Sequence, residues 1–245
     1  MQYQVSRVLA GPFLRTLWRP VVIGAEHVPA AGGAIIASNH LSIADSIFLP
    51  LMLARPVTFA AKSEYFRGTR LVDRLTGAYL RATKQLEVDR DGARAAHSML
   101  ETALALLQRG DLFGIYPEGT RSPDGRLYRG RTGVGWLAVR SGLPVIPVAM
   151  IGTDRVLPPG RTIPRLGRIQ IRIGAPMTFE GCTDTGNVAR ARRMITDEVV
   201  KAIQGLSGQE YVEMYASARK EELAAGATAV PPRPLTAPAD EEPGQ

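Results

Sequence analysis

The stretch AIIASNHLSIAD, residues 34–45, decides the fold of this chain, because it turns directly from a strand into a helix. Residues 34–37 form a short, uninterrupted apolar run, which is typical of a strand buried on both faces. Ser42 with Asp45 three residues later has the spacing of a capping box, and it predicts a helix over 42–53. A short polar turn therefore separates the strand from the helix.

The same alternation of apolar runs and helical patterns continues along the chain. Further strands are expected at 57–61, 86–88, 112–116, 144–150 and, with the pattern of an edge strand, 169–173. Helices are expected at 64–83, 92–109, 130–141, 188–205 and 209–225. This order predicts an α/β fold with a mostly parallel sheet flanked by helices.

Length and composition predict one domain with two flanking segments. The chain has 245 residues, which suffice for one α/β domain with a buried core, and we assign this domain to 21–226. Residues 227–245 are rich in proline, alanine and acidic side chains, which predicts a disordered tail. Residues 1–20 form a separate N-terminal segment.

The N-terminal segment mixes apolar and basic side chains, and two interpretations of it stay open. Its apolar members include Phe13, Leu14, Leu17 and Trp18, and its basic members include Arg15 and Arg19. Tryptophan beside arginine is typical of a segment that lies in a membrane interface. The apolar positions do not form one clean helical face, so packing in the core is the alternative.

Composition narrows the classes of partner without selecting one. The 30 basic and 23 acidic residues give a net charge of +7, which suits nucleic acid, anionic lipid or a phosphorylated substrate, and equally a solvated basic surface. The single cysteine excludes an internal disulfide, and the three histidines lack the spacing of a zinc site. No apolar run reaches the roughly 18–20 residues that span a bilayer, and no signal-peptide pattern is present. We therefore expect a protein that is soluble or lies on a membrane surface.

The polar turn after the first strand carries His40, five residues before Asp45. On an unbroken helix these positions would lie about 140° apart, but the break between strand and helix lets Asp45 fold back toward the imidazole. The carboxylate could then hold Nδ1–H and leave Nε2 as a base. The alternative is that Asp45 only caps the helix and that His40 is a packed turn residue.

A second motif, YPEGTRS at 116–122, follows another apolar strand. Ligands of open α/β sheets bind at the carboxyl ends of the strands, which is where this motif lies. Gly119 permits a close backbone approach, and Arg121 offers a guanidinium fork suited to phosphate. A tight turn with a surface ion pair is the alternative interpretation.

Residues 121–175 are unusually basic, with ten arginines against two aspartates. Arg131 stands at the start of a predicted helix, where a guanidinium and backbone N–H groups together could hold an anion. Arg129 offers another guanidinium, and a solvated basic loop is the alternative for both. No G-x-S-x-G, Walker-type or dinucleotide-binding glycine sequence occurs, so a base would have to activate an acceptor alcohol directly.

Four blocks of this sequence resemble, in order and spacing, the signature blocks of the PlsC-type glycerolipid (lysophosphatidate) acyltransferases. The first and third blocks are the two motifs above, the second is VDR at 88–90, and the fourth is LPVIPV at 143–148. GAEHVP at 24–29 also resembles the lead-in of that family, and the resemblance covers about residues 21–175.

The resemblance implies acyl transfer from acyl-CoA or acyl-carrier protein to a lysophospholipid or glycerol phosphate. The residues that it places in the site are His40 and Asp45 as the catalytic pair and, for substrate binding, Glu118, Gly119, Thr120, Arg121, Lys62 and Arg131. Arg131 stands where relatives often have lysine, and either side chain could hold an anion.

These implications predict a peripheral O-acyltransferase at the cytoplasmic face of the cell membrane, which makes phosphatidic acid from 1-acyl-glycerol 3-phosphate. The acyl thioester is a co-substrate, and no metal or bound cofactor is expected. The expected partners are lysophosphatidic acid and an anionic membrane surface, and not nucleic acid. Two alternatives stay open: the same chemistry on glycerol 3-phosphate, another lysophospholipid or a glycolipid, and a non-catalytic basic module that binds anionic membrane or nucleic acid.

Overall fold

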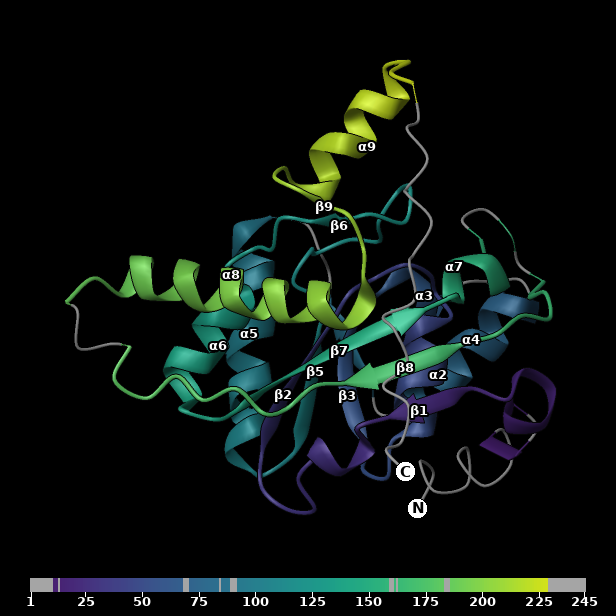
Figure 1. The fold of residues 1–245 in the computed structure, drawn as a ribbon. Coiled ribbons are helices and arrows are strands. Elements are labelled where there is room, and N and C mark those ends of the chain that lie inside the picture. Colours follow the sequence, from purple (N-terminus) through teal and green to yellow (C-terminus); the bar gives the residue numbers. More distant parts are fainter. Residues whose placement is uncertain are drawn as a thin grey trace, which may run out of the picture.

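The computed structural model describes residues 11–228, apart from 13, 68–70, 84, 89–91, 159–160, 162 and 183–185. Within this part of the chain, seven strands form one sheet in the order β1-β8-β7-β2-β5-β3-β4 (Figure 1). Their bounds are β1 Val21–Ile23, β2 Ala34–Ser38, β3 Val57–Lys62, β4 Leu86–Val88, β5 Leu112–Ile115, β7 Val145–Ile151 and β8 Gln170–Ile173.

Five neighbouring strands of this sheet run parallel, and two at one edge run the other way. β2 is parallel to both β5 and β7, and β3 is parallel to both β5 and β4. β8 is antiparallel to β7, and β1 lies parallel to β8 at the edge. The mostly parallel, mixed sheet that the sequence predicts is thus confirmed.

Helices cover both faces of the sheet (Figure 1). One face packs against α5 (Ala93–Gln108), α6 (Gly133–Ser141) and α8 (Val188–Ser207), with Phe113 and Val145 at the centre of the contact. The other face packs against α2 (Asp45–Met52) and α4 (Leu71–Ala82). The shorter helical elements are η1 Ala25–His27, α3 Glu64–Arg67, α7 Thr153–Val156 and α9 Ala216–Ala224.

Several predicted elements differ from those observed. The helices expected over 42–53 and 130–141 begin only at Asp45 and Gly133. Strand β8 was expected at an edge, but β1 covers it from outside, and the alternating exposure of β8 reflects one better-buried face. The helix expected over 209–225 begins only at Ala216, because Tyr211–Val212 forms strand β9 instead. β9 pairs in parallel with β6 (Leu127–Tyr128), a contact between segments about 80 residues apart in the chain.

Trp18 settles one open interpretation of the N-terminal segment. Its side chain is buried, its ring packs edge-on against Phe48 of α2, and its indole N–H donates to the Arg165 carbonyl at 2.8 Å. Leu17, in contrast, is 42% exposed. Trp18 therefore belongs to the core and is not available to a membrane. Residues 1–10, Phe13 and the tail from 229 onward lie outside the described residues, so the predictions for them stay predictions.

The parallel strands bring their carboxyl ends to one edge of the sheet. β2 ends at Ser38 and β5 at Ile115, directly before the two motifs, and the neighbouring β7 ends at Ile151. In open α/β sheets this edge is where ligands bind. The fold therefore joins the two motifs on the side expected to carry a site. No helix within the described ranges is long and apolar enough to cross a membrane.

Candidate active site

Asn39 fixes the end of strand β2 just before the first motif turns away. Its side-chain amide accepts from the Met150 N–H at 2.7 Å and donates to the Met150 carbonyl at 3.0 Å, as a peptide group of the ladder would. It also donates to Gln209 Oε1 at 2.7 Å. Since Asn39 is fully buried and its partners lie on other elements, the backbone position of His40 is set by the sheet and not by the turn alone.

His40 and Asp45 meet as the sequence predicts. His40 Nδ1 lies 2.9 Å from Asp45 Oδ2, and the two side chains are 12% and 0% exposed. The carboxylate can only accept, so Nδ1 carries the proton in this contact and Nε2 is the basic nitrogen of the neutral ring. The pair has the geometry of a base with its orienting acid.

Asp45 is the first residue of helix α2, whose N-cap Ala44 has no side-chain cap bond, and its carboxylate also closes the turn that leads into the helix. Oδ2 also accepts from the backbone N–H groups of Leu41 at 2.7 Å and Ser42 at 2.8 Å. Ser42 completes only part of the expected capping box, because its hydroxyl accepts from the Ala44 N–H and donates to the Leu157 carbonyl at 2.6 Å. The bonds from Leu41 and Ser42 fix the orientation in which the carboxylate contacts the imidazole.

An aromatic stack fixes the plane of the imidazole. The Tyr116 ring lies parallel to His40, with a centroid distance of 3.8 Å and an angle of 8°, and Phe59 stacks behind it at 5.0 Å. The Tyr116 and Ser46 hydroxyls share a hydrogen bond of 3.0 Å. Asp45 and Tyr116 together thus restrain the orientation of the imidazole.

Glu118 ties the two motifs together through their backbones. Oε1 accepts from the His40 N–H at 3.0 Å and Oε2 from the Tyr128 N–H at 3.1 Å, and the Ser122 N–H donates to the His40 carbonyl at 2.7 Å. The side chain is 1% exposed. Burial raises the pKa of Glu118 to about 8, against the two backbone donors, which lower it. The sequence predicts Glu118 at the acceptor, but both of its carboxyl oxygens face backbone N–H groups of the protein. In this structure its contacts position the two motifs relative to each other.

Gly119 is the position where the second motif needs glycine. Its φ is +73°, and a Cβ there would lie 2.9 Å from Cδ of Arg131, whose side chain crosses over it. Another residue would meet both a strained backbone and this side chain. Gly119 therefore lets the Arg131 side chain lie directly over the motif.

Three cations gather around this second motif, and we call them the cation cluster: Arg121, Arg131 and Lys220. Lys220, on α9, donates to Thr120 Oγ1 at 2.6 Å, and Arg131 donates to Ser217 Oγ on the same helix at 3.0 Å. Burial and the neighbouring Arg121 charge lower the pKa of Lys220. Among the described residues no carboxylate forms an ion pair with any member of the cluster.

The other predicted site residues are placed only in part. Lys62 ends strand β3 at the same edge of the sheet, but its side chain lies outside the described part of the structure, as do Asp89 and Arg90 of the second block. Arg129 pairs with Glu213 at 3.2 Å and contacts the Tyr215 ring, so its charge is matched within the protein.

Sequence reasoning missed the contribution of the C-terminal segment. Gln209 joins Asn39 to the Gly125 carbonyl, and Lys220 reaches the second motif from 100 residues away. No local pattern marks either residue, since both act through contacts distant in sequence. The one available signal was the rarity of lysine, of which the chain has four.

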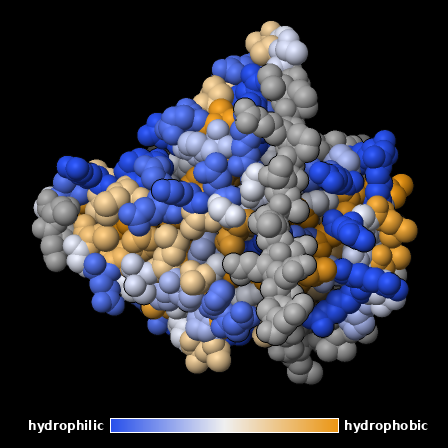
Figure 2. All heavy atoms as spheres, viewed as in Figure 1, coloured by the Kyte–Doolittle hydropathy of each residue, from blue (hydrophilic) through white to orange (hydrophobic). Residues whose placement is uncertain are grey.

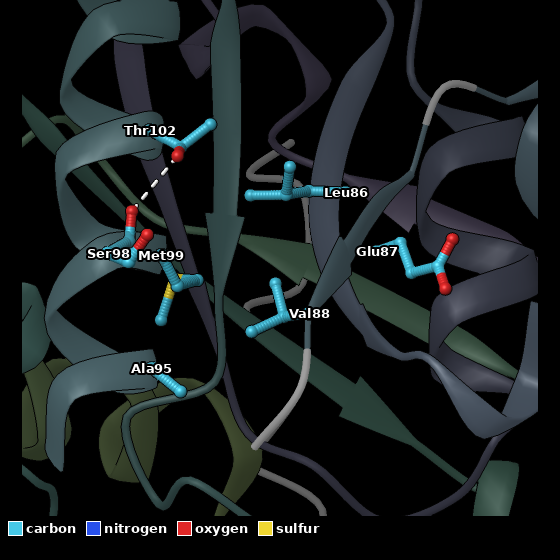
Figure 3. A pocket seen from close by; sticks show the side chains of 7 residues that line it. All are labelled: Leu86, Glu87, Val88, Ala95, Ser98, Met99 and Thr102. Carbon is cyan, nitrogen blue, oxygen red and sulfur yellow. Dashed lines mark hydrogen bonds between the residues drawn. The ribbon is translucent and has the colours of Figure 1, made fainter. Parts of the chain in front are cut away.

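A pocket of about 200 Å³ lies at another place, between strand β4 and helix α5 (Figure 3). The side chains that line it are Leu86, Glu87, Val88, Ala95, Ser98, Met99 and Thr102. It shares no residue with the His40–Asp45 pair or with the cation cluster, and we assign it no part in the chemistry below.

Fold and site together define an α/β protein in which a His–Asp pair and the cation cluster lie at the carboxyl edge of the sheet, and comparison with known proteins gives its class. The family model described as "Acyltransferase" matches residues 19–151, which include both motifs. The chain therefore belongs to the acyltransferase family, and the resemblance seen in the sequence is confirmed.

Relatives with curated names agree with this assignment. The chain is 28% identical over 191 residues to the chloroplastic 1-acyl-sn-glycerol-3-phosphate acyltransferase LPAT1 of Arabidopsis thaliana, covering 74% of this chain and 52% of that protein. It is 30% identical to the 1-acyl-sn-glycerol-3-phosphate acyltransferase of Bacillus subtilis, covering 64% of this chain and 72% of that protein. The chain spans about half the length of the plant relatives that it matches.

A solved structure shares the fold. The crystal structure of the 1-acyl-sn-glycerophosphate (LPA) acyltransferase PlsC from Thermotoga maritima superposes with a TM-score of 0.57 at 24% identity, covering 82% of each chain. At this identity the likeness supports the architecture alone, a mixed sheet flanked by helices, and this is the architecture described above.

Proposed function

We propose that this chain transfers a fatty acyl group from a thioester to the free hydroxyl of 1-acyl-glycerol 3-phosphate, giving phosphatidic acid. The observation that carries the proposal is the 2.9 Å contact of His40 with Asp45, at the edge of the sheet that also bears the cation cluster. The names of the curated relatives support the acceptor. A base beside cations without carboxylate partners suits an alcohol that carries a phosphate.

His40 acts as the general base in this proposal. Nε2 takes the proton of the acceptor hydroxyl as the oxygen attacks the thioester carbonyl, and a tetrahedral intermediate forms. When that intermediate collapses, the carbon–sulfur bond breaks and the thiol leaves with the proton that the imidazolium returns. The products are an ester and a free thiol, so atoms and charge balance without an acyl-enzyme.

Asp45 and Tyr116 keep the imidazole ready for this step. Asp45 holds Nδ1–H, which fixes the tautomer and stabilises the imidazolium once it forms. Tyr116 holds the plane of the ring by stacking at 3.8 Å. Because both contacts exist before substrate binds, little reorganisation is needed at the moment of attack.

The phosphate of the acceptor binds at the second motif, next to Arg121. Arg121 is partly exposed and makes no hydrogen bond or ion pair with the described residues, so its fork is open to a ligand. Arg131 crosses Gly119 beside it. Lys62 ends the adjacent strand at the same edge, as the resemblance implies for a phosphate ligand. The acyl donor is acyl-CoA or acyl-carrier protein, and the proposed steps use no metal or bound cofactor.

The protein docks on a membrane surface through a loop after α7, which we call the docking loop: residues 161 and 163–168. Its Ile163 and Leu166 are 78% and 71% exposed, and Arg161, Arg165 and Arg168 stand beside them. Figure 2 shows apolar and strongly polar atoms adjoining along the edge of the molecule that carries α7. Exposed apolar side chains among arginines suit an anionic interface, where lipid substrates are found.

The structure anchors the docking loop close to the active site. The Arg165 N–H donates to the Val156 carbonyl at 2.7 Å, its carbonyl accepts from Trp18, and Leu157 accepts from Ser42 of the first motif. Trp18, for which membrane contact and core packing were both open, thus supports the loop from within the core. A lipid drawn from the surface would reach His40 over a short path.

A thioester-dependent assay with a panel of acceptors tests the proposed function. Purified protein should release free thiol from acyl-CoA or acyl-carrier protein in the presence of lysophosphatidate, with equal formation of phosphatidate. Faster transfer to glycerol 3-phosphate, another lysophospholipid or a glycolipid would replace the acceptor and keep the chemistry. If no acceptor receives an acyl group from either donor, the proposed acyl transfer is refuted. The alternative would then be a non-catalytic basic module that binds anionic membrane or nucleic acid.

A further inference from the structure

Helix α9 has no role in the proposed chemistry, although two of its side chains contact residues of the cation cluster and the second motif. It lies beyond residues 19–151, the part that the family model matches. Figure 1 shows β6 and β9 side by side, with α9 directly beyond them. The Leu127 N–H donates to the Glu210 carbonyl and the Arg129 N–H to the Met214 carbonyl, so β9 fixes the start of the helix against the second motif.

One face of α9 turns toward that motif. Ser217 and Lys220, one helical turn apart, contact Arg131 and Thr120 at 3.0 and 2.6 Å. Tyr215, just before the helix, packs its ring against the Arg131 guanidinium at 5.2 Å. Contacts at Tyr215, Ser217 and Lys220 therefore hold this face of the helix against the motif, with the Lys220 ammonium directed at Thr120.

The position of Lys220 is electrostatically unfavourable without an anion. Its ammonium is partly buried beside Arg121, and the carboxyl group that acts on it, Glu118, faces backbone donors. Like charges held close together cost free energy unless an anion stands between them. Among the described residues its ammonium donates one hydrogen bond, to the neutral Thr120 hydroxyl, which leaves two ammonium protons for further acceptors.

We infer that Lys220 is a substrate-binding residue, which donates to a phosphate ester held between it and Arg121. The inference rests on the proposed function for the identity of the substrate, and it assigns the phosphate to the acceptor. A phosphate oxygen between the two side chains would neutralise both, and would leave Thr120 to orient the ammonium. The C-terminal segment thereby takes part in recognising the acceptor.

Kinetics of Lys220→Met test this inference, because methionine keeps the stem and removes the charge. We expect kcat/KM for lysophosphatidate to fall about 10-fold, the scale of one charge-assisted contact, mainly through KM. The preference for lysophosphatidate over monoacylglycerol, which lacks the phosphate, should fall by the same factor. Lys220→Arg, which keeps the positive charge, should retain part of this preference. Lys201→Met, an exposed lysine on α8, is the matched control and should change neither value.

A second readout does not depend on turnover. Glycerol 3-phosphate should raise the thermal unfolding midpoint of the wild type and of Lys201→Met, and should raise that of Lys220→Met much less. An equal rise in all three would overturn the inference. A lower unfolding midpoint of Lys220→Met with an unchanged KM for the acceptor would also overturn it. That result would mean that the lysine stabilises the fold and does not bind substrate.

The two possible sources of the phosphate are separated by varying one substrate at a time. A rise confined to the KM of acyl-CoA would place Lys220 at the donor and overturn the assignment to the acceptor. Arg121→Ala serves as the reference, with an expected loss of about 10–150-fold in acceptor kcat/KM. If Arg121→Ala is silent too, the proposed acceptor site fails; if only Lys220→Met is silent, the inference about α9 fails alone.

Discussion

His40 and Arg121 stand on two motifs that hydrogen-bond to each other, yet their surroundings are opposite. The His40–Asp45 pair is buried, and Oδ2 of Asp45 accepts from three donors of the protein itself. The cation cluster is partly exposed, and its charges have no carboxylate partner among the described residues. The bonds that orient His40 are thus present without substrate, whereas the cluster, in our proposal, is completed by its ligand.

This difference separates the two tasks of the site. A base must have its tautomer and direction fixed in advance, which buried hydrogen bonds accomplish. An anion site gains most when its cations repel one another until the ligand binds, since the ligand then relieves that repulsion. Substitutions in the His40–Asp45 pair should therefore lower kcat, and substitutions in the cation cluster should mainly raise the KM for the acceptor.

The largest expected effect is that of His40→Ala, which removes the base. Turnover should fall by about 10²–10⁴-fold, the usual range for a lost general base, with the KM for the acceptor little changed. Steady-state kinetics on folded protein measures this, and circular dichroism controls for folding. A folded variant with near wild-type turnover would exclude His40 as the base, and the His40–Asp45 pair would then have no separate catalytic task.

Asp45→Asn tests whether the carboxylate orients the ring or only caps the helix. Asparagine can still accept from Leu41 and Ser42, but its amide can present a donor to Nδ1 and so favour the wrong tautomer. Turnover should fall by about 10²-fold while the unfolding midpoint stays nearly constant. A normal kcat with a lowered midpoint would instead support the capping interpretation alone.

The His40–Asp45 pair could be predicted because its determinants are local. A strand, a break and a helix start within twelve residues place the two side chains together, and the sequence displays each of these signals. The parallel sheet followed in the same way from apolar runs alternating with helical patterns. The local signals of these strands agree with the global fold, as is expected of natural sequences.

The cation cluster could be predicted only in part, because its third member comes from elsewhere. Arg121 and Arg131 lie within one basic segment, but Lys220 depends on the pairing of β6 with β9, two strands of two residues each. Pairs so short carry no periodic signal. Trp18 shows the same limit, since its burial depends on Phe48 and on the Arg165 carbonyl, both distant in sequence.

Glu118 links the two motifs, and it predicts a pH dependence of stability. Folding raises its pKa from 4.5 to about 8, so between these values the folded protein holds a proton that the unfolded chain has lost. The stability that this group contributes is therefore full below about pH 4.5 and declines as the pH rises toward 8, by up to about 5 kcal/mol.

The variant Glu118→Gln isolates this contribution, because glutamine does not titrate. Denaturant unfolding from pH 5 to 8.5 should show the wild type losing stability relative to Glu118→Gln as the pH rises. A difference that stays constant over this range would mean that the carboxylate remains ionised, held by the His40 and Tyr128 N–H groups.

The smallest effect is expected at the docking loop, which touches neither the His40–Asp45 pair nor the cation cluster through its exposed side chains. Ile163→Ser with Leu166→Ser should weaken binding to anionic vesicles by roughly 10-fold, since two partly inserted apolar side chains are lost. Sedimentation with vesicles measures it, and Val188→Ser with Met194→Ser, two exposed positions on α8, is the matched control. Raising the salt concentration should weaken binding of all variants, because arginines near an anionic surface are screened.

Kinetics with a short-chain, water-soluble acceptor then separates docking from chemistry. The docking-loop double variant should keep its kcat and KM on this acceptor, because the base and the cations are intact, and should lose activity only on vesicle-bound lysophosphatidate. Equal losses on both acceptors would mean that the loop shapes the active site through Leu157 and Ser42. Unchanged vesicle binding would place the membrane contact on another face, with Leu17 the next exposed apolar side chain to replace.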